Sequence, residues 1–294
     1  MAKERRAVGG RAVAITGGAR GIGKAIAAEL VRRGARPAIG DLDLATAERA
    51  AAELGGGTVA LPLDVTDRDS FAAFLDGARE RLGALDGVVN NAGIMPVTPI
   101  DRESEDSIRR QIEINLVGVI TGTRLAIERL RPRGEGWIVN IASQAGKVGL
   151  PGIATYAATK HGVVGFSEAV RAELRGSGVE VVCVMPTLVN TELTSGVGQR
   201  WVRSVEPEDV ARAVVDAMET GRFEVFVPRS NGWLLRFAAL MPRRAAEAIG
   251  RLMGTDRLMT EVDEAARRAY EERAAASAGG ARAGASHEKT AAGG

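Results

Sequence analysis

Residues 11–30 read RAVAITGGARGIGKAIAAEL, an apolar run followed by a glycine-rich turn and an amphipathic stretch. The run 11–16 has the length of a buried strand, and the stretch after Gly23 has the periodicity of a helix. Gly17, Gly21 and Gly23 lie in the turn between them. Glycines here let backbone N–H groups approach a phosphate at the helix start. The stretch therefore predicts the first strand, turn and helix of a dinucleotide-binding α/β fold.

The alternation of short apolar runs and longer amphipathic stretches continues along the chain. It is typical of a parallel sheet covered by helices on both faces. The predicted strands are residues 11–16, 36–40, 58–62, 87–90, 136–141, 180–184 and 223–227. The predicted helices lie near residues 23–33, 44–54, 68–82, 103–130, 155–176 and 207–220. We expect a Rossmann-like, doubly wound parallel sheet of seven strands with a C-terminal helical extension.

The chain has 294 residues and 45% hydrophobic composition, which suits one large α/β domain. We expect an N-terminal arm over residues 1–10, a catalytic domain over 11–230 and a helical extension over 231–276. Residues 277–294 are rich in Ala, Gly and charge, and we expect them to be disordered. Lys and Arg (39) nearly balance Asp and Glu (37), so charge does not indicate a nucleic acid partner.

Targeting and metal-binding patterns are absent from the sequence. Residues 1–11 contain no apolar signal region, and no run approaches the length of about eighteen apolar residues that suggests a membrane helix. His161 and His287 lie far apart, and Cys183 stands in an apolar run where we expect a buried thiol. The sequence predicts a cytoplasmic protein without a bound metal.

Tyr156 and Lys160 are four residues apart, thirteen and seventeen residues after Ser143. On a helix, this spacing places the phenol and the ammonium on one face, where the cation lowers the phenol pKa from ~10. Ser143 follows an apolar strand and so lies at the carboxyl end of the sheet, where open α/β folds bind ligands. Asn115 stands mid-helix among apolar residues, a poor position for asparagine. Together these residues predict an acid/base site.

With the segment Asn90-Asn-Ala-Gly93, these motifs resemble the short-chain dehydrogenase/reductase family from about Gly10 to Val227. The resemblance implies that Tyr156 exchanges a proton with the substrate oxygen while a hydride moves to or from a nicotinamide. It also implies that Lys160 holds the nicotinamide ribose, Ser143 bonds the substrate oxygen and Asn115 keeps a water chain to Lys160. Singly, each of these residues has an ordinary structural explanation, and only the ordered set favours catalysis.

The resemblance implies a cofactor site as well. Asp41 closes the second strand, eighteen residues after Gly23, where an acid accepts hydrogen bonds from the ribose. A carboxylate there repels a 2′-phosphate and favours NAD(H), whereas Arg20 leaves NADP(H) open. The predicted cofactor-binding residues are Gly17, Arg20, Gly21, Ile22, Gly23, Asp41, Asp64, Val65, Asn90, Gly93, Tyr156, Lys160, Val189 and Thr191.

Within this set, Asp64 and Val65 would frame the adenine, and Asn90 with Gly93 would lie beneath the adenosine ribose. Asp64 as a helix cap is an equally good explanation. Val189 and Thr191 would contact the carboxamide and the pyrophosphate. The family commonly has Pro-Gly where this chain has Pro186-Thr187, so we expect the backbone there to bend differently.

The expected substrate walls, residues 147–153 and 190–201, supply Val148, Leu150, Pro151, Leu193 and Val197. This apolar lining, without an arginine cluster, fits a lipophilic secondary alcohol or ketone. Trp201 fits either this lid or simple packing. The rival functions are an NADP(H)-dependent carbonyl reductase and a non-catalytic dinucleotide-binding sensor or scaffold.

Residues 233–244 predict an apolar helix fringed by arginines. Such a helix packs against the core or a partner subunit, or it lies in a membrane interface. The resemblance implies a homodimer or homotetramer, formed through the helix that carries Tyr156 and Lys160.

Overall fold

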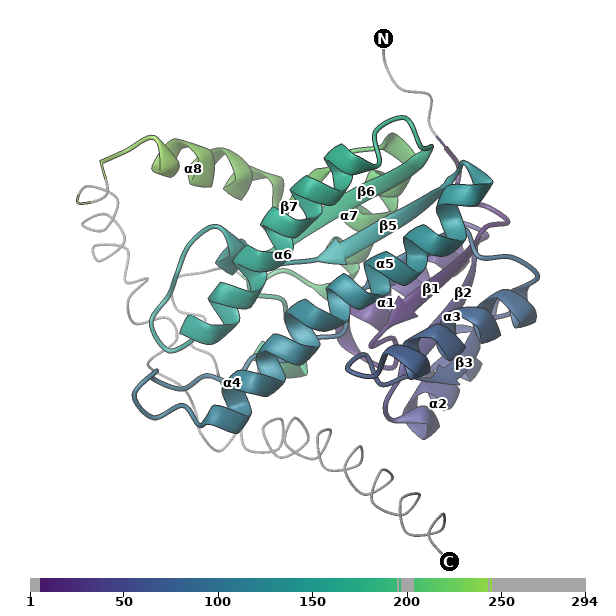
Figure 1. Cartoon of the computed structure of the whole chain (residues 1–294), viewed down its shortest axis with the longest axis horizontal. Coiled ribbons are helices and arrows are strands. Elements are labelled where there is room, and N and C mark those ends of the chain that lie inside the picture. The colour runs from purple at the N-terminus through teal and green to yellow at the C-terminus, as the bar shows by residue number, and fades with distance from the viewer. Residues whose placement is uncertain (1–5, 195, 197–203, 243, 245–294) are drawn as a thin grey trace, which may run out of the picture.

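One parallel sheet forms the centre of the computed structural model, which describes residues 6–194, 196, 204–242 and 244 (Figure 1). Its strands run in the order β3-β2-β1-β4-β5-β6-β7, and every neighbouring pair is parallel. The strands are β1 (Ala12–Thr16), β2 (Arg36–Asp41), β3 (Val59–Pro62), β4 (Gly87–Asn90), β5 (Gly136–Ile141), β6 (Val179–Pro186) and β7 (Glu224–Val227). The predicted fold is confirmed, and its order reverses between β1 and β4, where such sheets open a ligand crevice.

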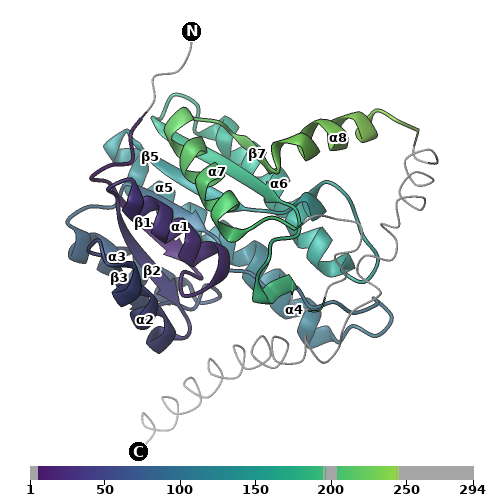
Figure 2. The same cartoon turned by 180° about the vertical axis from the view of Figure 1, so that it is seen from behind.

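Helices cover both faces of the sheet and build a separate core on each. On one face, α1 (Gly21–Arg32) packs beside α7 (Pro207–Thr220), with α2 (Leu44–Leu54) next to them (Figure 2). On the other face lie α3 (Arg68–Leu82), α5 (Gly118–Leu130) and α6 (Ala154–Glu173). Because both faces are covered, the central strands are mostly apolar and almost entirely buried, and Cys183 in β6 is buried as predicted.

Two helix starts are set by acidic caps. α7 begins at Pro207, as predicted, and the Asp209 side chain accepts from the backbone N–H of Glu206 (3.2 Å). α3 is capped by Asp67, whose carboxylate accepts from the N–H groups of Asp69 and Ser70. The alternative explanation of Asp64 as that cap is therefore wrong. Asp64 instead accepts from both the N–H and the hydroxyl of Thr66.

The predicted single helix over residues 103–130 is wrong in one respect. The chain forms α4 (Glu105–Ile112), then a π-helical turn, η1 (Glu113–Val117), and then α5. A π-helical turn inside an α-helix is uncommon and is found most often at functional sites. Here it contains Asn115, which is fully buried. The helical period cannot reveal this turn, because it adds only one residue to the repeat.

Short 3₁₀ turns complete the main connections: η2 (Arg131–Arg133), η3 (Gln144–Gly146) and η4 (Glu192–Thr194). After β7 the chain enters α8 (Arg229–Ala239), which lies at the edge of the sheet (Figure 1). Most of the predicted extension and all of the predicted disordered tail, residues 277–294, lie outside the described residues, so the domain divisions stay predictions. Over the described part of the chain, no helix combines the length and apolar character needed to cross a bilayer.

Candidate active site

The glycine-rich turn between β1 and α1 is built so closely that it excludes side chains. Gly17 and Gly21 have φ values of +62° and +52°, a region that favours glycine. A Cβ on Gly23 would overlap the carbonyl oxygen of Gly17 and lie 2.6 Å from Asn91 Nδ2. The turn therefore leaves its backbone accessible at the start of α1.

The start of α1 has the features of an anion site. Arg20 occupies the cap position without a side-chain hydrogen bond to the helix, and the first turn contains no acid. The first N–H groups of α1 and the positive end of its dipole thus suit a pyrophosphate. Thr191, in the loop after β6, closes the opposite side, with its Cγ2 atom 3.4 Å from the position of a Cβ on Gly21. These residues fit a nicotinamide dinucleotide.

Asn91 holds this turn in place, although the sequence did not single it out. Its Nδ2 atom donates to the carbonyl oxygens of Thr16 (2.9 Å) and Gly17 (3.1 Å). Asn90 points to the opposite face of the sheet, where its Nδ2 donates to Asn140 Oδ1 (2.8 Å). The doubled asparagine was the available signal, and strand alternation decides which side chain reaches the turn. A place for Asn90 beneath the ribose stays a prediction.

Asp41 faces the glycine-rich turn from the end of β2. Its two carboxylate oxygens accept from the N–H groups of Ala19 (3.2 Å) and Asp43 (3.2 Å), and burial raises the pKa of the carboxyl. Arg20 lies close by but is engaged elsewhere. Its Nη2 atom bonds Asp43 Oδ2 (2.8 Å) and Thr46 Oγ1 (3.1 Å) at the start of α2. The cation is thus held against the helix that follows Asp41.

Lys160 is buried beside the other residues predicted to form the acid/base site. Its side chain is 3% exposed, and Nζ donates to the carbonyl oxygen of Ile141 (2.9 Å). Nζ also lies 5.6 Å from the ring centroid of Tyr156. Burial lowers the pKa of Lys160 to about 8. A Cβ on Gly93 would lie 3.7 Å from this Nζ and 3.1 Å from Asn115 Oδ1, so the structure brings these four residues together.

Asn115 is fixed by the backbone of the loop that follows β4. Its Oδ1 accepts from the N–H of Ile94 (2.8 Å), and its Nδ2 donates to the carbonyl oxygen of the same residue (2.8 Å). This paired bond is the physical reason for an asparagine among apolar neighbours, because it fastens the π-helical turn to the loop beside Gly93. The water chain to Lys160 stays a prediction.

Ser143 stands at the carboxyl end of β5, as predicted, and caps η3 by accepting from the N–H of Ala145 (3.1 Å). Tyr156 packs into an apolar cluster that also contains Ala145, two residues after Ser143. The buried members are Met95, Ala145, Ile153, Tyr156 and Ala157, with Val97, Leu150, Leu188 and Leu193 packed against them.

The cluster includes two of the five predicted lining residues, Leu150 and Leu193, whereas Val148 is 40% exposed and Pro151 is also exposed. Val197 and Trp201 lie outside the described residues. Met95 and Leu188 were missed because each follows a strand end, and only the folded sheet brings those ends together.

The loop after β6 takes an ordinary backbone path in spite of its missing glycine. No residue other than glycine has positive φ in the described part of the chain, so Thr187 carries no left-handed strain. Its N–H donates to the carbonyl oxygen of Val227 (2.9 Å). Val189, two residues on, is buried and pairs with Val205 in an isolated bridge. Among the described residues, no three His, Cys, Asp or Glu side chains gather as a metal site requires.

Comparison with known proteins agrees with this geometry. A family model described as short chain dehydrogenase matches residues 11–200, which include every predicted site residue. The uncharacterized oxidoreductase Mb1385 of Mycobacterium bovis is 39% identical over 217 residues, 70% of this chain and 88% of that protein. Human 17-beta-hydroxysteroid dehydrogenase 13 is 28% identical over 256 residues, 85% of each chain. The 3-ketoacyl-(acyl-carrier-protein) reductase of Brucella melitensis, solved with NADH, has a TM-score of 0.69 and 29% identity, covering 75% of this chain and 97% of that one.

Proposed function

The chain belongs to the short-chain dehydrogenase family, and we propose that it transfers a hydride between NAD(H) and a lipophilic secondary alcohol or ketone. As a member, it is an oxidoreductase that acts on alcohols with a nicotinamide dinucleotide. The proposed lipophilic substrate rests on the apolar cluster around Tyr156, which borders buried Lys160. The human relative supports it, since its name specifies a hydroxysteroid, an alcohol of this class.

In the proposed mechanism, the bound dinucleotide supplies the group that accepts the hydride from the alcohol carbon or returns it to the ketone. Tyr156 takes the hydroxyl proton during oxidation and returns it during reduction. The Lys160 ammonium lowers the pKa of the phenol through its positive charge. Ser143 holds the reacting oxygen, and the apolar cluster excludes water from it. Asn115 acts indirectly, by fixing the loop beside Gly93.

The proposed substrate class is tested with NAD and a series of secondary alcohols of increasing chain length, followed by the absorbance of NADH. We expect kcat/KM to rise by about fourfold per added methylene until the pocket is filled, since each buried methylene contributes about 0.8 kcal/mol. A series of hydroxy acids of the same lengths is the matched control. Equal or better turnover of the acids would contradict an apolar pocket.

Cofactor preference is expected to depend on Asp41. Replacing Asp41 by Ser should raise kcat/KM for NADP relative to NAD by about tenfold or more, because it removes a carboxylate that repels the 2′-phosphate. Asp69→Ser is the control, since it changes the charge equally at a side chain that is 95% exposed. A wild-type preference for NADP(H) would instead favour the rival carbonyl reductase. The hydrogen bond of Arg20 to Asp43 supports NAD(H), because it holds the cation on α2.

The location and the assembly of the protein are also part of the proposal. We infer that the protein is cytoplasmic and that it contacts membranes peripherally through residues 231–244. We also infer that it forms a homodimer or homotetramer through α6. The surface next to α6 supports the assembly, because Ile112 and Val117 are partly exposed there. Light scattering over a range of concentrations measures the mass, and a monomer throughout would refute the assembly.

A further inference from the structure

α8 presents an apolar face to solvent. Its exposed apolar side chains are Trp233 (77%), Leu234 (57%) and Phe237 (65%), and Leu240 (84%) is exposed directly after the helix. Their spacing places them on one side of the helix. The other side is anchored: Leu235 packs into the cluster that contains Phe226, and a Cβ on Gly232 would lie 2.7 Å from the Phe226 ring. A contiguous apolar surface of this kind on a fixed helix indicates a binding surface.

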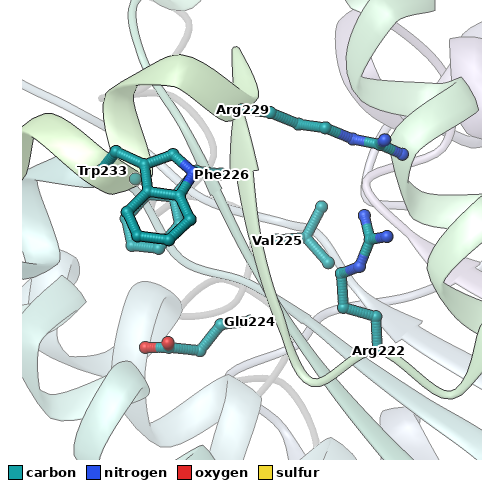
Figure 3. Close-up of a pocket in the computed structure, with 7 residues that line it drawn as sticks. Arg222, Glu224, Val225, Phe226, Arg229 and Trp233 are labelled. Atoms are coloured by element: carbon teal, nitrogen blue, oxygen red, sulfur yellow. The ribbon is translucent and has the colours of Figure 1, made fainter.

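The charge around this face is mostly positive, although Arg229 lies 4.0 Å from Asp216 and the hollow below α8 includes Glu224. Residues 228–246 contain four arginines, at positions 229, 236, 243 and 244, and no Asp or Glu. Below α8, a hollow of about 340 Å³ is lined in part by Arg222 and Arg229, which lie on one side of β7, with Trp233 on the other (Figure 3). Glu224, which also lines this hollow, pairs with Lys147 (3.2 Å). The surface thus combines exposed aromatic and aliphatic groups with a cationic border.

We propose that α8 docks the protein on an anionic lipid bilayer. Trp233 and the apolar side chains of the helix lie at the boundary of headgroups and acyl chains, and the arginines contact the phosphates. An eleven-residue helix spans only about 16 Å, so it lies in the interface and does not cross the bilayer. A second copy is the competing occupant of this face, and self-association without lipid is the outcome that would identify it.

α8 is also tied to the active-site loop. Asn231 Nδ2 donates to Gln144 Oε1 (3.0 Å), and Gln144 Nε2 donates to the carbonyl oxygen of Val227 (3.1 Å). Gln144 directly follows Ser143. Docking through α8 therefore holds the substrate side of the site near the bilayer, the source of a lipophilic substrate. This last step rests on the proposed function, whereas lipid binding does not.

The test is flotation of the full chain with phosphatidylcholine vesicles, with and without about one-third phosphatidylglycerol. We expect binding to the anionic vesicles, weakened at least about tenfold by the double substitution Trp233→Gln and Phe237→Gln. Ile100→Gln is the control, because Ile100 is an apolar side chain, 59% exposed, in the loop between β4 and α4, and this variant should bind vesicles as the wild type does. Arg229→Gln and Arg244→Gln should each weaken binding about fivefold, on anionic vesicles only.

Two outcomes overturn the proposal. One is the absence of binding to anionic vesicles, or binding that the double substitution leaves unchanged. The other is lipid-free self-association that the same substitution abolishes, which would identify a second copy as the occupant. Turnover measured on the same samples separates the two proposals: turnover without flotation refutes docking alone, and flotation without turnover refutes the proposed activity alone.

Discussion

Replacing Tyr156 by Phe is expected to lower kcat by about 10³-fold while the affinity for NAD(H) changes by less than about threefold. General acid–base groups typically contribute 10²–10⁴-fold, and a thousandfold loss corresponds to about 4 kcal/mol of transition-state stabilisation. The side chain is 7% exposed and packs in an apolar cluster, so Phe keeps its volume and its packing. Steady-state kinetics and a fluorescence titration with NADH measure the two quantities.

The chain contains a natural control for this substitution. Its only other tyrosine is Tyr270, which lies outside the described residues. Tyr270→Phe should leave turnover unchanged. If Tyr156→Phe kept more than about a tenth of wild-type turnover, the phenol would not be the acid/base group. If the wild type bound NAD(H) without turning over any alcohol or ketone, the sensor alternative would replace the enzymatic proposal.

The sheet could be predicted because each strand carries its own signal. The run before Gly17 is apolar except for Thr16 and is buried at every position, and similar runs recur wherever a strand is covered on both faces. The π-helical turn around Asn115 carries no comparable signal. It depends on the carbonyl and N–H of Ile94, a residue twenty-one positions away, and only the folded chain brings that backbone to the helix.

The site residues show the same division. The glycine-rich turn could be recognised because a turn with no room for side chains requires glycine, here at Gly17, Gly21 and Gly23. The partner of Arg20 could not, because Asp43 reaches it only through the relative positions of α1 and α2. The same limit applies to Lys160, which the sequence presents as an ordinary cation with a neighbouring phenol. Its burial, and with it the fall of its own pKa to about 8, depends on the packing of α6 against β6 and on the carbonyl of Ile141 at the end of β5.

Replacing Lys160 by Met is expected to lower kcat by about 10²-fold or more and yet to stabilise the fold at pH 7. The loss of turnover follows because the phenol loses the cation that lowers its pKa. The gain arises because burial lowers the pKa of Lys160 from 10.5 to about 8, so folding disfavours its charged form. That pKa difference corresponds to a gain of about 3 kcal/mol in the free energy of unfolding. Loss of the hydrogen bond to the Ile141 carbonyl reduces this gain by about 1 kcal/mol. The expected net gain is about 2 kcal/mol.

The pH dependence of this gain has a definite sign. Below pH 8 both the folded and the unfolded wild type carry the proton, and the full penalty for burying the charge is present. Between pH 8 and 10.5 the unfolded chain binds more protons than the folded one, so wild-type stability rises with pH relative to the variant. Above this window Lys160 is neutral in both states. The advantage of Met should therefore be largest below pH 8 and disappear by about pH 10.5.

Urea unfolding of both proteins at pH 7 and pH 10 measures this difference. Lys147→Met is the matched control, because Lys147 is 30% exposed and pairs with Glu168 and Glu224. It removes the same charge without relieving a buried one, so it should give no gain at pH 7. A Lys160→Met variant that is less stable than wild type at pH 7, or whose advantage persists unchanged at pH 10, would mean that the ammonium is not held at an electrostatic cost. Burial of the Lys160 ammonium beside Tyr156 would then not lower the free energy of unfolding, and removing this charge would not stabilise the fold.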